Sequence, residues 1–272
     1  MSLRWLAESY EGDRLVARVG RDGDVLVAEW IGLASFRANR DGSGVVFEPE
    51  SGAPSLETKK LERGPSRLLR LHLEGGIPLH GAAVAIDDRA VVILGAPEQG
   101  KSTLAASLCL AEGARLLADD AVAIEKTESG GFVVLCLEDL CWLDGRASRA
   151  LGIEAVESSP KRPVAVASAP NKPEKDGGAA KVERLDMIVQ LEYTEGMTVD
   201  LVRLTGIEAI AGILKQLTRL VVDEPAVAKR DLEALADLTL AVPVFRLTRP
   251  RNLERLPESV ALLAATLREA TR

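Results

Sequence analysis

The first 60 residues alternate short apolar runs with turn-forming residues. Apolar runs stand at 15–17, 25–27 and 45–47, and Glu-Gly or Asp-Gly pairs lie between them. Short apolar runs separated by such turns are typical of antiparallel strands joined in chain order. The pattern predicts a small β-rich subdomain over residues 1–60, which ends in a linker at 50–55 that contains glycine and proline.

From residue 61 to 272 the pattern changes to one of alternating strands and helices. A hairpin is expected around Asp87-Asp88 and another around Glu195-Gly196. Residues 171–181 are charged, contain glycine and lack periodicity, which predicts a mobile loop. Alternation of strands and helices predicts the α/β fold class. Strands are predicted at 82–86, 89–94, 115–118, 132–137, 185–193, 198–204 and 242–247, and helices at 62–75, 101–111, 144–152, 206–221, 228–240 and 257–269.

Composition narrows the functional classes. The chain has 272 residues, of which 47% are hydrophobic and 28% charged, as in an ordinary globular protein. The net charge of −7 argues against a broad nucleic-acid-binding or anionic-membrane-binding surface. No apolar stretch is long enough for a membrane span and no signal-peptide core begins the chain, so a cytoplasmic location is expected. With three cysteines and two histidines, structural cysteines are favoured over a zinc site.

The clearest chemical signal is a glycine-rich loop between a strand and a helix. Residues 95–103 read Gly95-Ala96-Pro97-Glu98-Gln99-Gly100-Lys101-Ser102-Thr103 and match the P-loop, or Walker A, pattern G-x-x-x-x-G-K-[ST]. The β-branched run 91–94 precedes the loop, and an Ala- and Leu-rich helical stretch follows it up to Gly113. In such a loop the backbone N–H groups and the helix N-terminus create a site for phosphate oxygens. The sequence therefore predicts nucleotide binding at residues 95–103.

Four residues in and after the loop complete the phosphoryl-transfer chemistry. Lys101 is placed to reach the β- and γ-phosphates, and the Ser102 hydroxyl to bind Mg²⁺. Asp119 and Asp120 follow the short apolar stretch 115–118. Ligands of open α/β sheets bind outside the carboxyl ends of strands, so both carboxylates are expected to face the P-loop. Adjacent carboxylates repel one another unless a cation relieves them, which favours a metal site over a solvated turn.

The order of these motifs resembles a known family. The segments Leu79-His80-Gly81, Gly95-x4-Gly100-Lys101-Ser102 and Gly113-x-Arg115-Leu116-x-Ala118-Asp119-Asp120 resemble the kinase domain of bacterial HPr kinase/phosphorylase. They resemble still more the HPr-kinase-like proteins, which include kinases of lasso-peptide precursors. A weaker likeness continues through 185–188 and 242–247 to the C-terminal helix. The resemblance implies a P-loop kinase core of the HPr kinase/phosphoenolpyruvate carboxykinase type over residues 61–272, beside the small N-terminal β-rich subdomain.

The resemblance also implies an activity and roles for individual residues. It implies an ATP- and Mg²⁺-dependent kinase that phosphorylates a hydroxyl, with a serine of a peptide or small protein as the expected acceptor. It implies Asp119 as the base that takes the substrate proton, Asp120 with Ser102 at the metal, and His80 near the phosphates. From the sequence alone, a purely structural role for His80 is equally plausible. Family kinases are often oligomeric, so a homo-oligomer is expected by analogy.

The chain departs from the family pattern in two places. Position 98 is usually glycine in the family and is Glu98 here. If the backbone there requires a positive φ, a side chain costs about 1 kcal/mol or more. The carboxylate also stands near a phosphate cradle, and Gln99 adds bulk. The signature segment of true HPr kinase/phosphorylases is only echoed at 149–153, which argues against phosphorolysis and against HPr as the substrate.

Two other functions remain open at this point. One is a nucleotide-binding but catalytically weak or inactive module, in which Glu98 has impaired the cradle and the N-terminal β part docks a partner. The other is an ATPase or GTPase switch. The switch is disfavoured because the sequence shows no clear water-orienting glutamine and no repeat of oligomeric ATPase motifs.

Overall fold

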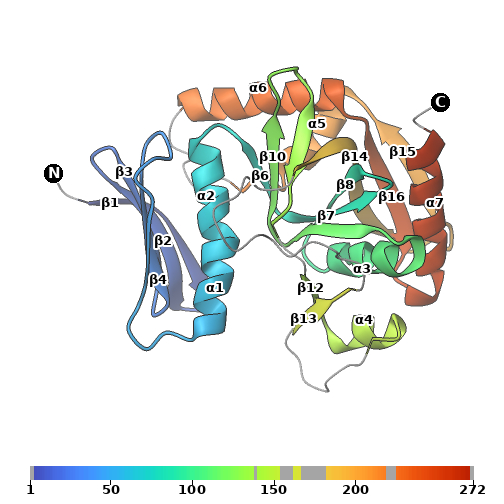
Figure 1. Cartoon of the computed structure of the whole chain (residues 1–272), viewed down its shortest axis with the longest axis horizontal. Coiled ribbons are helices and arrows are strands. Elements are labelled where there is room, and N and C mark those ends of the chain that lie inside the picture. The colour runs from blue at the N-terminus through green and yellow to red at the C-terminus, as the bar shows by residue number, and fades with distance from the viewer. Residues whose placement is uncertain (1–2, 138–139, 154–161, 167–181, 219–224, 270–272) are drawn as a thin grey trace. The chain divides into compact units, whose positions relative to one another are not determined.

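A computed structural model describes residues 3–137, 140–153, 162–166, 182–218 and 225–269 (Figure 1). The predicted mobile loop at 171–181 lies outside the described residues. Contacts divide the chain into two compact units, one formed by Met1–Pro78 with Thr218–Glu233 and the other by Leu79–Leu217 with Ala234–Arg272. The chain is of the mixed α/β type, as predicted. Among the described helices, none has both the length and the apolar character needed to cross a bilayer.

The first unit contains a five-stranded antiparallel sheet with the strands in chain order, which confirms the predicted meander. Phe36 and Leu26 are fully buried on one face of this sheet and pack with Leu69 of the following helical segment. Alternation along each strand directs every second side chain to this core. The strands are β1 (Arg4–Glu11), β2 (Arg14–Asp22), β3 (Val25–Trp30), β4 (Ala34–Asn39) and β5 (Val46–Pro49).

Two helices follow the sheet where the sequence predicts one helix over 62–75. They are α1 (Ser55–Arg63) and α2 (Pro65–Leu73), and Gly64 between them has φ −99° and ψ −91°, outside the helical region. Proline has no N–H to donate, so it cannot continue a preceding helix but is tolerated at a first helical position. The helix predicted over 62–75 is therefore present as α2, with its start moved to Pro65, whereas α1 was not predicted.

A buried hydrogen bond between a histidine and an aspartate links α2 to the later part of the first unit. Nε2 of His72 lies 3.0 and 3.1 Å from the two carboxylate oxygens of Asp231, and both side chains are at least 95% buried. Arg230 donates to the carbonyl oxygen of His72 and to Asp231. Burial raises the pKa of Asp231, but the hydrogen bond and charge of His72 and the charge of Arg230 outweigh it and lower that pKa. Asp231 is on α6 (Pro225–Ala241).

The second unit is built on a mixed sheet in the order β10-β11-β14-β8-β7-β9, with β16 beside β14 and β15 beside β16. A separate two-stranded sheet joins β12 and β13. The strands are β6 (Ile77–Leu79), which spans the division between the units, β7 (Gly81–Ile86), β8 (Arg89–Leu94), β9 (Arg115–Asp119), β10 (Val122–Lys126), β11 (Phe132–Leu135), β12 (Leu140–Leu143), β13 (Arg162–Ala165), β14 (Val182–Thr194), β15 (Asp200–Leu204) and β16 (Val244–Pro250).

Strand directions bring several carboxyl ends to one edge of this sheet. β14 runs parallel to β8 and to β16. β7 is antiparallel to both β8 and β9, so β9 runs in the direction of β8. The segments after β8, β9, β14 and β16 therefore leave from the same edge, which is where ligands bind in α/β sheets.

One predicted strand pairing is wrong. The sequence predicts a hairpin around Glu195-Gly196, but β14 and β15 do not pair with each other in the described residues. β16 lies between them, parallel to β14 and antiparallel to β15. β15 is largely exposed, which suits the edge of the sheet, whereas the apolar β16 is more fully buried inside it. The hairpin around Asp87-Asp88 is present as predicted.

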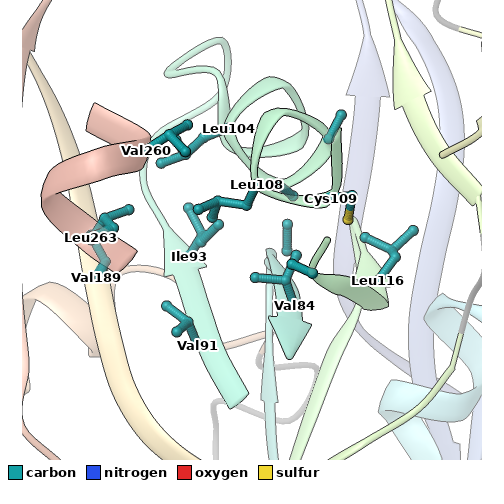
Figure 2. Packing of buried hydrophobic residues seen from close by; sticks show 14 of the residues in the cluster. Val84, Val91, Ile93, Leu104, Leu108, Cys109, Leu116, Val189, Val260 and Leu263 are labelled. Atoms are coloured by element: carbon teal, nitrogen blue, oxygen red, sulfur yellow. The ribbon is translucent and has the colours of Figure 1, made fainter. Parts of the chain in front are cut away.

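Helices α3 (Lys101–Glu112) and α7 (Leu256–Glu269) pack on the sheet of the second unit. In Figure 2, Leu108 of α3 points toward Ile93 of β8, and Leu104 lies beside Val260 of α7. α3 ends at Gly113 in the left-handed conformation, the predicted glycine cap. The remaining helical elements are α4 (Gly145–Ala150), α5 (Gly206–Leu214) and the short 3₁₀ helix η1 (Leu253–Arg255).

Candidate functional site

The strand, loop and helix predicted around the P-loop are present in that order. β8 ends at Leu94, and α3 begins at Lys101. Gly100 has φ 78°, and no side chain caps the N-terminus of α3. The uncapped N–H groups of a helix N-terminus carry partial positive charge and bind anions. The start of α3 therefore presents N–H groups of the kind that bind anions.

Lys101 lies over this loop. Its Nζ donates hydrogen bonds to the carbonyl oxygens of Gly95, at 2.9 Å, and Ala96, at 3.2 Å. The residue is 7% exposed, so its charge is largely removed from water. Carbonyl oxygens satisfy an ammonium group only partly, and a phosphate oxygen would be a stronger partner.

A pocket of about 720 Å³ opens beside the loop, within the size range of small-molecule sites. Of the predicted site residues, it is lined by His80, Lys101, Ser102 and Asp120 together with loop residues. The structure thus brings His80 and the loop into one cavity. The lining is His80, Pro97, Glu98, Gly100, Lys101, Ser102, Thr103, Asp120, Trp142, Asp144, Arg146, Ala147, Tyr193, Arg249, Arg251, Asn252 and Leu253.

Asp119 is buried directly behind the loop. The Ser102 hydroxyl donates to its Oδ1 at 2.9 Å, and the backbone N–H of Trp142 donates to its Oδ2 at 2.7 Å. The side chain is 1% exposed. Burial raises the pKa of this carboxyl to about 6, and the charge of Asp120 adds to the rise against the hydrogen bonds from Trp142 and Ser102. A cation beside this carboxylate would favour its ionised form.

Asp120 follows the end of β9 and has a left-handed backbone with φ 65°. Nδ1 of His80 lies 3.0 Å from the carbonyl oxygen of Asp120, so Nδ1 carries the proton and donates it. Asp120 and His80 both line the pocket, whereas Asp119 does not. His80 therefore makes a structural contact and also lines the pocket. The sequence left open whether this histidine is structural or lies near the phosphates.

The aspartate that contacts Ser102 is not the one that the family resemblance implies. The resemblance places Asp120 with Ser102 at the metal, but the Ser102 hydroxyl contacts Asp119. Asp120 lies beyond the last residue of β9 and lines the pocket together with Ser102, whereas Asp119 is the carboxylate in hydrogen-bond contact with the Ser102 hydroxyl. The sequence does not reveal which carboxylate makes this contact, because that depends on the face that β9 turns toward α3.

Glu98 has the positive φ that its position in the loop suggested, 64°. Its side chain is 83% exposed and lies 3.6 Å from the guanidinium of Arg251. The carboxylate thus faces solvent at the rim of the pocket and is partly neutralised there. Backbone strain at Glu98, and not obstruction of the cradle, is the main consequence of the missing glycine.

Three pocket residues from the C-terminal half of the sheet were not singled out from the sequence. Arg249, at the end of β16, is 2% exposed, and its Nη2 donates to the carbonyl oxygen of Gln99 at 3.0 Å. The guanidinium carbons of Arg249 and Arg251 lie 5.2 and 5.5 Å from the ring centroid of Tyr193, at the end of β14. The available signal was the Arg-Pro-Arg-Asn segment after the last predicted strand, at 249–252.

Among the described residues, no group of three or more His, Cys, Asp or Glu side chains gathers to hold a metal ion. Mg²⁺ in phosphoryl-transfer sites needs fewer protein ligands, since one or two carboxylates, substrate phosphates and water complete its shell. The Ser102 hydroxyl and the Asp119 carboxylate are hard oxygen donors of the required type. These residues fit a Mg²⁺ ion that arrives with a nucleotide.

Neither a protein-family model nor a curated protein matches this chain. Among solved structures, the chain is similar to the Hpr(Ser) kinase/phosphatase from Coxiella burnetii over 71% of its own length and 98% of that chain. The two share 17% sequence identity, and the TM-score is 0.36.

Proposed function

We propose that this protein is an ATP- and Mg²⁺-dependent kinase that transfers a phosphoryl group to a hydroxyl, with a serine of a peptide or small protein as the acceptor. One observation carries the proposal: the Ser102 hydroxyl of the P-loop contacts the buried carboxylate of Asp119, beside a pocket that Asp120 lines. A phosphate cradle, a metal-type oxygen pair and a second carboxylate are the parts that phosphoryl transfer needs.

Nucleotide binding falls to the loop and to Lys101. The N–H groups at the start of α3 bind phosphate oxygens, and Lys101 exchanges the carbonyl oxygens of Gly95 and Ala96 for phosphate. Ser102 and Asp119 would hold Mg²⁺. When bound, ATP and Mg²⁺ supply the transferable γ-phosphoryl group and the positive charge that stabilises the transition state.

Proton transfer falls to Asp120. Its carboxylate would accept the proton of the acceptor hydroxyl as that oxygen attacks, and His80 holds the backbone of Asp120 through its carbonyl oxygen. Asp119 is less suited to this task because it is buried and already accepts hydrogen bonds from Ser102 and Trp142. The proposal therefore exchanges the roles that the family resemblance gives to the two aspartates.

A second candidate function is a nucleotide-binding module without strong catalysis. The observation that favours it is Glu98, which holds a left-handed backbone at φ 64° in the loop and pairs with Arg251 at the pocket rim. Non-glycine residues in this conformation are uncommon, and such strain can disfavour the loop geometry that a bound nucleotide needs.

A labelling experiment separates the two candidates. The purified protein is incubated with Mg²⁺ and γ-labelled ATP, with peptides or small carrier proteins encoded near its gene as acceptors. The kinase predicts label on serine that is lost in Lys101→Ala. If the wild type binds ATP but labels neither these acceptors nor any protein in a broad extract, the kinase proposal is wrong and the binding module is preferred.

A further inference from the structure

We infer that Arg249 is a phosphate-binding residue of this site and that its guanidinium contacts an oxygen of the nucleotide's β- or γ-phosphate. The inference rests on the proposed nucleotide-binding function and extends it to a residue outside the P-loop. In the alternative, Arg249 has a purely structural role and only holds the loop through its hydrogen bond to Gln99.

Arg249 is a buried cation without an anionic partner. The residue is 2% exposed, and no ion pair in the described part of the chain includes it. Nη2 donates a hydrogen bond to the neutral carbonyl oxygen of Gln99, and the buried Nε finds no hydrogen-bond partner among the residues that the structure describes. Buried charges in proteins are normally paired, since removal from water is costly. The guanidinium of Arg249 therefore keeps hydrogen-bonding capacity that the described residues leave unused, and the residue lines the pocket beside the loop.

Burial also affects the electrostatics of this guanidinium. It lowers the pKa of Arg249, and the neighbouring Tyr193 opposes this effect. Arginine nevertheless remains protonated, because its unperturbed pKa lies far above neutral pH. An anion that reaches this desolvated cation is attracted more strongly than one at a solvated surface arginine.

The position of Arg249 fits a phosphate ligand. It lines the same pocket as Lys101 and Ser102. A Cβ atom on Gly100 would lie only 2.5 Å from Nη2 of Arg249, so the guanidinium stands against the last glycine of the P-loop. The planar fork of an arginine presents two parallel donors that match the oxygens of a phosphate.

The other arginines near the loop differ from Arg249. Arg251 is 67% exposed and already pairs with Glu98, and Arg146 is exposed at the pocket rim. Arg246 lies on the same strand as Arg249 but pairs with Glu192 and Glu208 and does not line the pocket. Arg246 therefore offers a matched control, with the same side chain on the same strand but with its own carboxylates.

The first test measures binding of Mg²⁺-tripolyphosphate and of Mg-ATP by calorimetry. Arg249→Gln is expected to weaken both affinities about ten- to a hundredfold, the range for loss of a charge-assisted hydrogen bond in a buried site. Arg246→Gln is expected to change them by less than about twofold. Unchanged binding in Arg249→Gln would overturn the inference. If Arg249→Gln does not fold, Arg249→Lys takes its place, because a lysine keeps the charge but lacks the paired donors.

The second test reports contact directly and follows binding in the wild type, with a variant used only to assign the signal. Arginine Nε–H resonances of the wild type are followed by NMR during titration with Mg²⁺-tripolyphosphate, and Arg249 is assigned by the signal missing from Arg249→Lys. We expect the Arg249 resonance to shift in proportion to bound ligand. A stationary resonance at saturation would show a purely supporting role, even if the variants bind weakly.

These measurements also separate failure of the inference from failure of the proposed function. If the wild type binds neither ATP nor tripolyphosphate, both are wrong. If the wild type binds them and Lys101→Ala abolishes binding while Arg249→Gln does not, only the inference about Arg249 is wrong.

Discussion

The hydroxyl of Ser102 donates a 2.9 Å hydrogen bond to Oδ1 of Asp119, which joins the first turn of α3 to the end of β9. The two residues are 17 positions apart in the sequence and belong to different elements, the helix α3 and the strand β9. A hydroxyl and a carboxylate in this relation offer two adjacent oxygens to one cation.

This relation predicts that Asp119→Asn weakens Mg²⁺-dependent nucleotide binding. The substitution preserves size but removes the charge that a cation would neutralise. The measurement is ATP affinity with and without Mg²⁺, and the gain from Mg²⁺ should shrink in the variant. An unchanged gain would exclude Asp119 as a metal ligand.

Asp120→Asn should behave differently. ATP affinity is expected to remain near that of the wild type, while transfer slows by roughly 10² to 10⁴, the usual contribution of a general base. Single-turnover labelling of an acceptor peptide measures the transfer step separately from binding. The opposite pattern, with slow transfer in Asp119→Asn and lost Mg²⁺ dependence in Asp120→Asn, would restore the assignment that the family resemblance implies.

Lys101→Ala should remove most of the stabilisation that Mg-ATP gives. A ligand that binds only the folded state at a hundred times its Kd stabilises it by about 2.7 kcal/mol. Thermal unfolding with and without Mg-ATP measures this effect. Lys126→Ala is a suitable control, because Lys126 is half exposed and pairs with Asp237 away from the pocket. An equal thermal shift in Lys101→Ala would reject the P-loop as the binding site.

Glu98→Gly is expected to tighten nucleotide binding. Glycine adopts the φ of 64° without the cost of about 1 kcal/mol that a side chain carries there, and it removes a negative charge from the loop. Glu98→Gln separates these causes, since it removes the charge but keeps a side chain. Loss of the exposed pair with Arg251 should matter little, because such pairs contribute about 0–1 kcal/mol. Weaker nucleotide binding in Glu98→Gly would mean that the Glu98 side chain contributes to nucleotide binding.

The raised pKa of Asp119 predicts opposite pH dependences for stability and for metal binding. Because this pKa is about 6 in the folded protein against 3.8 ordinarily, the folded state favours protonated Asp119. Its contribution to the unfolding free energy is full below pH 3.8 and is lost as the pH rises through about 6. A pKa difference of about two corresponds to about 3 kcal/mol. The measurement is the unfolding free energy of the metal-free wild type and of Asp119→Asn from pH 4 to 7. The stability advantage of the wild type over the variant should shrink as the pH rises.

Mg²⁺ binding should change in the opposite direction over the same range. A carboxylate must be ionised to bind the metal, so Mg²⁺-dependent ATP affinity is expected to rise as the pH increases through about 6. A flat profile between pH 5 and 7 would contradict a metal-binding role for a protonatable Asp119.

In the first unit, Asp231→Asn should destabilise the fold strongly. The substitution removes the charged acceptor of the hydrogen bonds from His72 and Arg230, and loss of a hydrogen bond to a charged group costs about 1.5–3 kcal/mol. The lowered pKa of Asp231 means that its stabilisation is present above the ordinary value of 3.8 and is lost as the pH falls. Urea unfolding at neutral and acid pH tests both statements, and an equally stable variant at pH 7 would contradict them.

The local parts of the candidate site could be predicted from the sequence. The strand before Gly95 and the helix after Lys101 follow from nearby apolar positions, and Asp119 follows the next strand at a short distance along the chain. The direction in which each carboxylate points could not be predicted, since it depends on how β9 lies against β7. Arg249 and Tyr193 were missed because they reach the loop through the pairing of β14 with β8 and β16.

The errors in the fold have similar causes. The hairpin predicted around Glu195 assumed that neighbouring strands in the chain pair with each other, but the buried β16 inserts between them. Helix α1 was not predicted because its sequence is largely polar, and the start of α2 at Pro65 was signalled by the Gly64-Pro65 pair. The local pattern of apolar and polar residues thus identified most helices and strands. Which strands lie side by side depends on contacts between distant parts of the sequence.

The late arrival of β16 has a consequence for synthesis of the protein. The bond from Arg249 to Gln99 spans 150 residues of sequence, and the strand that carries Arg249 forms near the end of the chain. Before that strand is made, the chain passes back through the first unit at Thr218–Glu233. A nascent chain on the ribosome can therefore form the N-terminal sheet early, but it cannot complete the nucleotide pocket until almost all of it has been translated.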